Sequence, residues 1–226
     1  MSRHAQPGLE LPTSLGRSVL RGLLLALIAG TLSLCARGSW AADWTTIEER
    51  PDPESGYHLY SRAVGGSDFP EFRIRGVVNA PPERVARAIE IVLTDPRYAA
   101  EGQTREVLHR EPDRWLLYTY IDLPSFFSDR DVVAIATLTR NEAASEYELK
   151  WSETGDNGPG PKEGVVRMPS SRGSWKLTRA DGGKTQVECV SHSDMGGALP
   201  AWLVRSRSAR FMVDRLTTLR GVAAGF

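Results

Sequence analysis

The chain turns from strand to helix at Asp194-Met195-Gly196-Gly197-Ala198-Leu199-Pro200-Ala201-Trp202-Leu203. Two glycines and a proline end a strand-like run there. The segment that follows, to about Arg220, repeats its apolar residues roughly every 3.5 positions, which predicts an amphipathic helix. Pro200 suits the first turn of this helix, and Gly221 suits its end. Because the chain upstream is nearly all strand-like, we expect a curved sheet that grips the helix, with a cavity between them.

The upstream segments predict strands in series and one further helix. Strand-like runs at 57–62 and 71–78 precede a helix that starts at Pro81-Pro82 and stops at Asp95-Pro96. Residues 44–50 read as a short helix or an arm. Short polar turns join several later strands, which indicates antiparallel neighbours and excludes a doubly wound parallel sheet, so the predicted fold class is α+β. The later strand candidates are 104–109, 114–123, 131–139, 147–152, 165–168, 174–179 and 185–193.

The first 42 residues differ from the rest of the chain. Arg17 and Arg21 precede an apolar run at 22–36, and Ser39-Trp40-Ala41-Ala42 offers small residues for cleavage. This pattern is typical of a secretory signal, and the apolar run is short for a membrane span. We therefore expect a signal peptide at 1–42, a single domain at 43–226, and a periplasmic or secreted protein. An uncleaved inner-membrane anchor is the alternative.

Composition limits the classes of function. The chain has 226 residues, enough for one good-sized domain, and its formal net charge is +0, which gives no electrostatic case for nucleic acid. Without residues 1–42 only Cys189 remains, so no intrachain disulfide is possible and a buried, inert thiol is predicted. No histidine has metal-ligand spacing with Cys, Asp or Glu, and no nucleophile elbow or phosphate loop is present. We predict no metal, no cofactor and no catalytic residue.

Charged residues in strand-like runs are the first candidates for ligand contacts. Ser128-Asp129-Arg130-Asp131 precedes an apolar strand. A turn with a structural salt bridge is the favoured interpretation for Asp129, whereas Arg130 and Asp131 could place a charge pair at the cavity wall. Arg167 stands among apolar residues and, if buried, needs an acid or a ligand head group as its partner. His192 is a weaker candidate, because a strand histidine is usually a satisfied structural residue.

Aromatic and basic residues supply the remaining candidates. Trp151 and Trp175 suit the wall or the core of the domain, with packing as the simpler interpretation of each. Phe126-Phe127 lies in a loop, where the pair could touch a membrane or fold inward. The basic side of the terminal helix could meet anionic lipid or form a solvated face. Its arginines are Arg205, Arg207, Arg210, Arg215 and Arg220.

Five blocks of the sequence together resemble START domains, the steroidogenic acute regulatory protein-related lipid-transfer domains, in their bacterial secreted form within the Bet v 1-like superfamily. The resemblance extends from about Trp44 to Val222. The last of the blocks is the most specific, since the proline junction in the second is shared across the superfamily. The blocks are Gly56-Tyr57-His58-Leu59-Tyr60-Ser61-Arg62, Val78-Asn79-Ala80-Pro81-Pro82-Glu83-Arg84-Val85, Asp129-Arg130-Asp131-Val132-Val133, Gly164-Val165-Val166-Arg167-Met168 and Ser193-Asp194-Met195-Gly196-Gly197-Ala198-Leu199-Pro200-Ala201-Trp202-Leu203.

The resemblance implies a helix-grip fold: a curved antiparallel sheet wrapped round the C-terminal helix, with a lipid-sized tunnel between them. It also implies that the tunnel binds a single lipid or sterol without a metal or cofactor. We expect a monomer that contacts a membrane surface transiently. The candidate lipid-binding residues are Arg130, Asp131, Trp151, Arg167, Trp175, His192, Trp202 and Leu203.

A closed tunnel must open to admit a lipid. Gly196 and Gly197 give the strand-to-helix junction the greatest backbone freedom, so we expect the gate there. Phe126-Phe127 and the loop at 155–161 are the alternative gates.

Two other functions stay open. One is an aromatase/cyclase-type enzyme on the same scaffold, with Arg167 and Asp131 as cavity groups. The other is an envelope interaction module whose cavity is filled by side chains.

Overall fold

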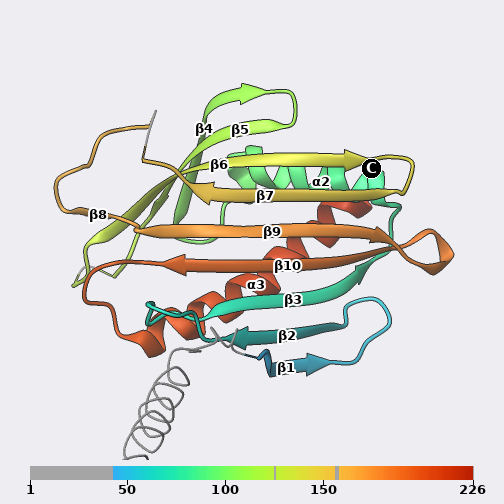
Figure 1. The fold of residues 1–226 in the computed structure, drawn as a ribbon, viewed down its shortest axis with the longest axis horizontal. Coiled ribbons are helices and arrows are strands. Elements are labelled where there is room, and N and C mark those ends of the chain that lie inside the picture. Colours follow the sequence, from blue (N-terminus) through green and yellow to red (C-terminus); the bar gives the residue numbers. More distant parts are fainter. Residues whose placement is uncertain (1–42, 125, 156–157, 226) are drawn as a thin grey trace, which may run out of the picture. The chain divides into compact units, whose positions relative to one another are not determined.

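The structure, a computed structural model, describes residues 43–124, 126–155 and 158–225. Within these residues the chain forms a ten-stranded sheet with two α-helices against one of its faces (Figure 1). The helix-grip α+β class predicted from the sequence is confirmed. The signal peptide predicted at 1–42 lies outside the described residues, as do positions 156 and 157 of the 155–161 loop, so the cleavage of the signal stays a prediction.

Neighbouring strands follow the order β1-β2-β3-β10-β9-β7-β6-β5-β4, and every pair along this path is antiparallel. The short β8 departs from the pattern, because it pairs in parallel with the start of β6. The strands are β1 (Thr45–Arg50), β2 (Tyr57–Arg62), β3 (Glu71–Val78), β4 (Gln103–Glu111), β5 (Arg114–Ile121), β6 (Asp129–Asn141), β7 (Glu146–Glu153), β8 (Val165–Arg167), β9 (Ser170–Arg179) and β10 (Thr185–Asp194).

The N-terminal segment corrects the sequence interpretation. Residues 44–50 were expected to form a short helix or an arm, but Thr45–Arg50 is the edge strand β1, paired with β2. All six of its residues are exposed, so it has no buried face to produce an alternating pattern. Its place depends on backbone pairing and on contacts such as the 2.5 Å hydrogen bond that Tyr57 Oη donates to Glu48.

Helix α2 (Pro82–Thr94) follows the sequence signals, with Pro82 in its first turn and Asp95 as its C-cap. Helix α3 (Ala201–Ala224) begins after Pro200, as predicted, but it continues past Gly221 to Ala224. The predicted stop was therefore wrong. Gly221 is exposed with open space around its Cα, so the helix tolerates it at a cost of about 1 kcal/mol relative to alanine. Packing of Leu219 and Ala223 on the buried side outweighs that cost.

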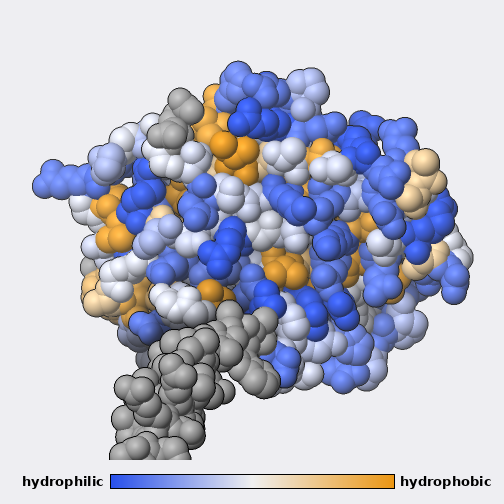
Figure 2. Space-filling view, in the orientation of Figure 1, coloured by the Kyte–Doolittle hydropathy of each residue, from blue (hydrophilic) through white to orange (hydrophobic). Residues whose placement is uncertain are grey.

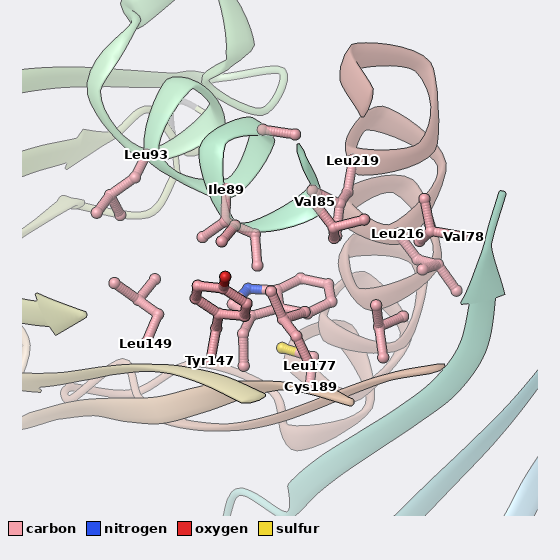
Figure 3. Close-up of a cluster of buried hydrophobic side chains, with 14 of the residues drawn as sticks. Val78, Val85, Ile89, Leu93, Tyr147, Leu149, Leu177, Cys189, Leu216 and Leu219 are labelled. Atoms are coloured by element: carbon pink, nitrogen blue, oxygen red, sulfur yellow. The ribbon is translucent and has the colours of Figure 1, made fainter. Parts of the chain in front are cut away.

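The core fills the end of the grip where α2 and α3 both pack on the sheet (Figure 3). Alternating residues of each strand point inward, so one face of the sheet is apolar. The opposite face mixes hydrophilic side chains with smaller hydrophobic patches (Figure 2). The largest fully buried side chains of this core include Leu59, Ile74, Val85, Trp115, Leu149, Leu177, Met212, Leu216 and Leu219.

Arg220 fixes the C-terminal half of α3 to the sheet. Its guanidinium donates hydrogen bonds to three backbone carbonyls, those of Val77 (3.0 Å), Ser55 (2.9 Å) and Gly56 (2.7 Å). The side chain thus satisfies carbonyls at the start of β2 and the end of β3, and it does not belong to a solvated basic face. Only the N-terminal half of α3, which has no such anchor in the described chain, leaves room beneath it.

Candidate functional site

A pocket of about 770 Å³ lies between the N-terminal half of α3 and the inner face of the sheet. This volume falls in the range of small-molecule sites. The pocket is bounded by α3, β4, β5, β6 and the strand ends of β9 and β10, together with the loops that carry Leu123 and Met195. Its main apolar wall residues are Leu117, Ile121, Val132, Ala134, Met168, Leu203, Val204 and Phe211.

Small inward-facing residues leave this space unfilled. On β10 the inner positions change from Val187 and Cys189 in the core to Ser191 and Ser193 at the pocket. On β9 they change from Leu177 and Trp175 in the core to Ser171 at the pocket, and α3 presents Ser208. Because a close-packed interior needs large apolar side chains, serines at these inner positions leave space between the sheet and the helix. The cavity is therefore encoded in the sequence.

Trp151 lines the end of the pocket that adjoins the hydrophobic core. Its indole lies against Gly173 on the neighbouring strand, where any Cβ would overlap the ring and the carbonyl of Val190. The guanidinium carbon of Arg215 stands 5.8 Å from the ring centroid on the pocket side. The predicted wall residue Trp151 therefore lines the pocket, and so does Leu203.

Two arginines reach the pocket that the sequence interpretation did not select. Arg105 extends from β4, and its Nη1 donates to the carbonyls of Val92 (3.0 Å) and Leu93 (3.4 Å) at the end of α2. Arg215 extends from α3 and was considered only as part of a basic helix face. The signal for Arg105 was its alternation with Gln103 and Val107 on the inner side of β4. Arg215 directly precedes the buried Leu216.

Arg130, predicted to contact ligand, instead fixes the strand-to-helix junction. It is buried, and it donates from Nε to the carbonyl of Met195 (2.6 Å) and from Nη2 to that of Gly196 (2.9 Å), while Nη1 donates to Ser128. Burial lowers the pKa of this guanidinium. It is absent from the described pocket lining, so its position supports a structural role.

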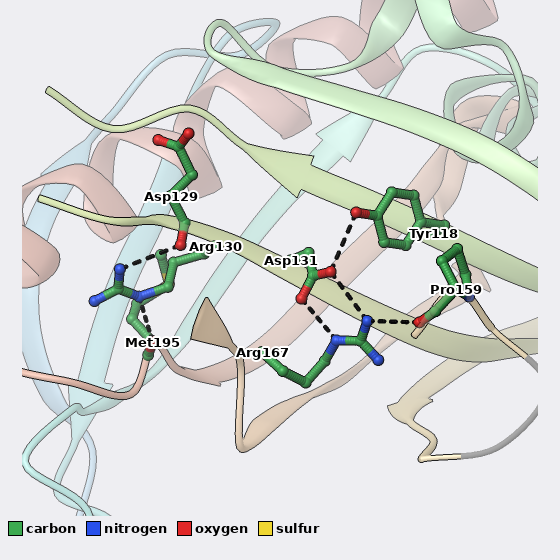
Figure 4. A network of polar contacts seen from close by, with 7 residues as sticks. All are labelled: Tyr118, Asp129, Arg130, Asp131, Pro159, Arg167 and Met195. Atoms are coloured by element: carbon green, nitrogen blue, oxygen red, sulfur yellow. Dashed lines mark hydrogen bonds and ion pairs between the residues drawn. The ribbon is translucent and has the colours of Figure 1, made fainter. Parts of the chain in front are cut away.

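Asp131 and Arg167 form an ion pair on the outer face of the sheet (Figure 4). Asp131 follows Arg130 and precedes the pocket residue Val132, so strand alternation turns it away from the cavity. Arg167 contacts it from Nε (2.6 Å) and Nη2 (3.0 Å), and Tyr118 Oη donates to the same carboxylate (3.1 Å). Hydrogen bonding to Arg167 lowers the pKa of Asp131, and the pairing raises the pKa of Arg167. The described pocket lining includes neither residue.

Comparisons with known proteins define the family. A family model of the START domain matches residues 37–222. The chain belongs to the START domain family. The resemblance inferred from the sequence blocks is thereby confirmed, including the extent of the match across the described domain.

One relative and two solved structures are similar to this chain over most of its length. An uncharacterized protein of Pseudomonas aeruginosa is 27% identical over 206 residues, which cover 90% of this chain and 96% of that protein. A STAR-related lipid transfer protein fragment from Xanthomonas axonopodis aligns with a TM-score of 0.67 at 22% identity, covering 80% of this chain and 98% of that one. Human StAR-related lipid transfer protein 5 aligns with a TM-score of 0.65 at 18% identity, covering 92% and 98%.

Trp175 and His192, two predicted ligand contacts of this START domain, lie outside the described pocket lining. Trp175 faces inward but is packed within the core beyond Trp151. His192 alternates with the pocket residues Ser191 and Ser193 and therefore points to the outer side, where it is buried and its Nδ1 has no hydrogen-bond partner in the described chain. Burial lowers the pKa of this imidazole. Neither residue is part of the described pocket lining, so neither is retained as a ligand contact.

The junction and loop residues predicted as a gate lie at the edge of the pocket. Gly196 and Gly197 have φ values of +60° and +65°, in the left-handed region that favours glycine. Trp202 is 70% exposed, and Phe126 is 78% exposed, with its ring centroid 4.7 Å from that of Phe127. Trp202 therefore points away from the pocket, while its neighbours Leu199 and Leu203 line it.

Three further expectations concern thiol, metal and membrane chemistry. Cys189 is buried, as predicted, and burial raises the pKa of its thiol to about 12. Across the described residues, no group of three or more His, Cys, Asp or Glu side chains is arranged to hold a metal ion. No helix in that part of the chain combines the length and apolar character needed to cross a membrane.

Proposed function

We propose that this START domain binds a single lipid, sterol or other hydrophobic ligand in the pocket under α3 and transfers it between membranes of the cell envelope. The observation that carries the proposal is the cavity of about 770 Å³ with its apolar walls, between a helix and a sheet that pack closely elsewhere. Removing a lipid chain from water is favourable by roughly 25 cal/mol per Å² of apolar surface. The names of two similar solved structures, both lipid transfer proteins, agree with this function.

Titration with fluorescent lipids tests the binding function. Delipidated protein should bind a fluorescent fatty-acyl probe or a fluorescent sterol to saturation at one molecule per chain. Failure of both probes, and of a wider lipid panel, to bind would favour the interaction module with a filled cavity.

The aromatase/cyclase alternative depended on Arg167 and Asp131 as cavity groups. Both lie on the outer face, so this pair gives it no support.

We place the protein in the periplasm or outside the cell, on the basis of the basic and apolar segment at 17–36. Cleavage within 39–42 would release a monomeric soluble domain, whereas retention would tether it to the inner membrane. Cell fractionation with mass spectrometry of the N-terminus separates the two forms. Recovery of the intact chain from the cytosol would contradict the proposed location.

Membrane contact is proposed for the exposed residues at the edge of the pocket. Trp202 and Phe126 are the exposed large aromatic side chains of the described chain, and each lies within two residues of a residue that lines the pocket. Exposed arginines follow on α3, at positions 205, 207 and 210. Exposed aromatic rings at the edge of the pocket, with exposed arginines on the adjoining helix, match the chemistry of an anionic lipid surface.

Trp202 should enter the interface when the protein meets anionic vesicles. With the other tryptophans of 43–226 replaced by phenylalanine, its emission should shift to shorter wavelength on addition of phosphatidylglycerol vesicles. The same chain with Trp202→Phe serves as the blank. Emission that ignores the vesicles, while lipid transfer continues, would place the membrane contact elsewhere.

The gate is proposed at Gly196 and Gly197. Gly197→Pro should slow lipid transfer between vesicles about tenfold, because proline requires a φ near −65° and Gly197 has a φ of +65°. Equilibrium affinity should change less than the rate, since the pocket walls are untouched. Stopped-flow transfer of a fluorescent lipid measures the rate, with Gly65→Pro in the β2–β3 loop as the control. A normal transfer rate in Gly197→Pro would contradict a gate at the two glycines and favour one at Phe126-Phe127 or in the 155–161 loop.

A further inference from the structure

Two guanidinium groups enter the pocket from opposite sides. Arg105 extends from β4 and Arg215 from α3, and both line the cavity. Arg215 directly precedes Leu216, which is buried in the core. The pair therefore stands where the cavity meets the packed interior.

Neither arginine has an acidic partner among the described residues. Arg105 donates only to the carbonyls of Val92 and Leu93, through Nη1, which leaves Nε and Nη2 without a partner. Arg215 has only aromatic partners, Trp151 at 5.8 Å and Phe211 at 5.1 Å from its guanidinium carbon to the ring centroids. Three other arginines of this domain, by contrast, have several polar partners each. Arg167 pairs with Asp131, and Arg130 and Arg220 each donate to three or more carbonyls.

The electrostatics of the pocket leave a positive charge unbalanced. Burial, followed by the charge of Arg215, lowers the pKa of Arg105 to about 10, so this side chain remains protonated at neutral pH. Burial also lowers the pKa of Arg215. The acidic residues of the lining, Glu101, Asp122 and Asp214, are exposed, and none pairs with either arginine.

Ligand binding would make this imbalance more severe. In an open pocket, water can solvate both guanidinium groups. A lipid that fills the pocket expels this water. An uncharged lipid would then leave two like charges desolvated without a counter-charge, which is strongly unfavourable. A carboxylate or phosphate replaces the lost water with charge-assisted hydrogen bonds, to which the guanidinium geometry is well matched.

We propose that the ligand of this pocket is an anionic lipid whose carboxylate or phosphate group binds between Arg105 and Arg215. The inference rests on the proposed lipid-binding function and specifies the class of lipid. It also orients the ligand with its head inward. Leu203, at the junction end of the pocket, lies about 18 Å from Arg215 along α3 at the rise per residue of an α-helix. The acyl chain then extends from the arginines toward Leu199 and Leu203, at the proposed gate.

Competition between matched lipids tests the inference. Delipidated protein is equilibrated with equal amounts of oleic acid and methyl oleate, and separately with phosphatidic acid and diacylglycerol, and the bound species are resolved by native mass spectrometry. The first pair reports on a carboxylate and the second on a phosphate. We expect the anionic member of at least one pair to be preferred about tenfold or more, the order of effect of a charge-assisted hydrogen bond. The pair that shows the preference identifies which anion the site takes.

Variants of the two arginines assign that preference to the pocket. Arg105→Met with Arg215→Met keeps long side chains but removes both charges, so the preference should fall to near unity while methyl oleate or diacylglycerol still binds. Arg215→Lys keeps a charge and should retain part of the preference. Arg110→Met, an exposed position on the same strand as Arg105, is the control and should behave like the natural protein.

The stability of the ligand-free protein gives a second readout. Because the two like charges repel each other and have no acidic partner, Arg215→Met should leave the Tm of ligand-free protein unchanged or raise it. A loss of folding cannot then explain a loss of preference. Equal binding of the charged and uncharged lipids in both pairs, or a preference that survives in the double variant, would overturn the inference. Absence of binding by all four lipids would contradict the proposed function itself.

Discussion

Asp131→Asn should lower the free energy of unfolding by about 3 kcal/mol, because it leaves the Arg167 guanidinium beside a neutral partner in a largely dry site. The Asp131 side chain is 1% exposed and that of Arg167 is 27% exposed, so water can compensate only in part. Asparagine keeps the shape of the side chain and can still accept the hydrogen bond from Tyr118. Chemical denaturation at neutral pH measures the change.

The same pair makes stability depend on pH. The pKa of Asp131 is lowered in the folded protein from an ordinary value of 3.8, chiefly by hydrogen bonding to Arg167. A depressed carboxyl pKa contributes stability above the unfolded value, and the contribution disappears as pH falls through the folded value. The difference in free energy of unfolding between the natural protein and Asp131→Asn should therefore disappear as the pH falls through and below 3.8.

Lipid binding by the Asp131→Asn variant distinguishes a structural ion pair from a contact with the ligand. Asp131→Asn should bind lipid with unchanged affinity under conditions where it is folded, since the pocket lining does not include this residue. Glu111→Gln, which breaks a surface pair with Arg114, is the control and should leave stability unchanged within error. Normal stability combined with lost lipid binding in Asp131→Asn would mean that the ion pair belongs to the binding site after all.

Gly173→Val should lower the free energy of unfolding by about 3 kcal/mol, at the upper end of overpacking effects. A Cβ at this position overlaps the Trp151 indole and the Val190 carbonyl. Displacement of the ring toward the pocket would bring it against Arg215, whose guanidinium carbon stands 5.8 Å from the ring centroid. Lipid affinity should therefore fall together with stability, as measured by denaturation and by probe titration.

A double-mutant cycle checks the cause. Trp151→Ala in the Gly173→Val background should recover part of the lost stability, because the clash with the ring is removed while the overlap with the Val190 carbonyl remains. Gly221→Ala is the matched control. Nothing surrounds that glycine on the exposed side of α3, so alanine should stabilise the helix by up to about 1 kcal/mol. Additive effects of the two β-sheet substitutions would contradict the proposed contact between Trp151 and Gly173.

Most of the fold could be predicted from the sequence because its signals are local. Alternation in Glu71–Val78 and helical spacing in Pro82–Thr94 each reflect one buried face of a regular element. Thr45–Arg50 escaped prediction because an exposed edge strand buries no face. The end of α3 was misplaced because a solvent-facing glycine can be carried inside a long packed helix.

The site was predictable only in part, because strand alternation gives the face of a side chain but not its distance from the cavity. Trp175 shares the inner face with the pocket residue Ser171, yet it lies in the core. Arg130 also points inward, but its length carries the guanidinium to the carbonyls of Met195 and Gly196. Asp131 and Arg167 could be paired only once the parallel contact between β6 and β8 was known.

Arg105 and Arg215 could not be assigned to the pocket from the sequence for a similar reason. Arg215 is one of several arginines on α3, and only packing distinguishes it from the exposed Arg207 and Arg210. Arg105 lies on a strand whose pattern is weak, with exposed residues on both sides of it. Their common cavity depends on the approach of α3 to a sheet segment far away in the sequence, which no local pattern encodes.

Native mass spectrometry of the purified chain tests the central claim most directly. We expect a species heavier than the chain by the mass of one lipid, which delipidation removes and added lipid restores. Ala134→Trp, which places an indole inside the pocket, should abolish that species, whereas Thr137→Trp on the exposed face of the same strand should retain it. A chain that carries no lipid after purification and takes up none when lipid is added would contradict the account.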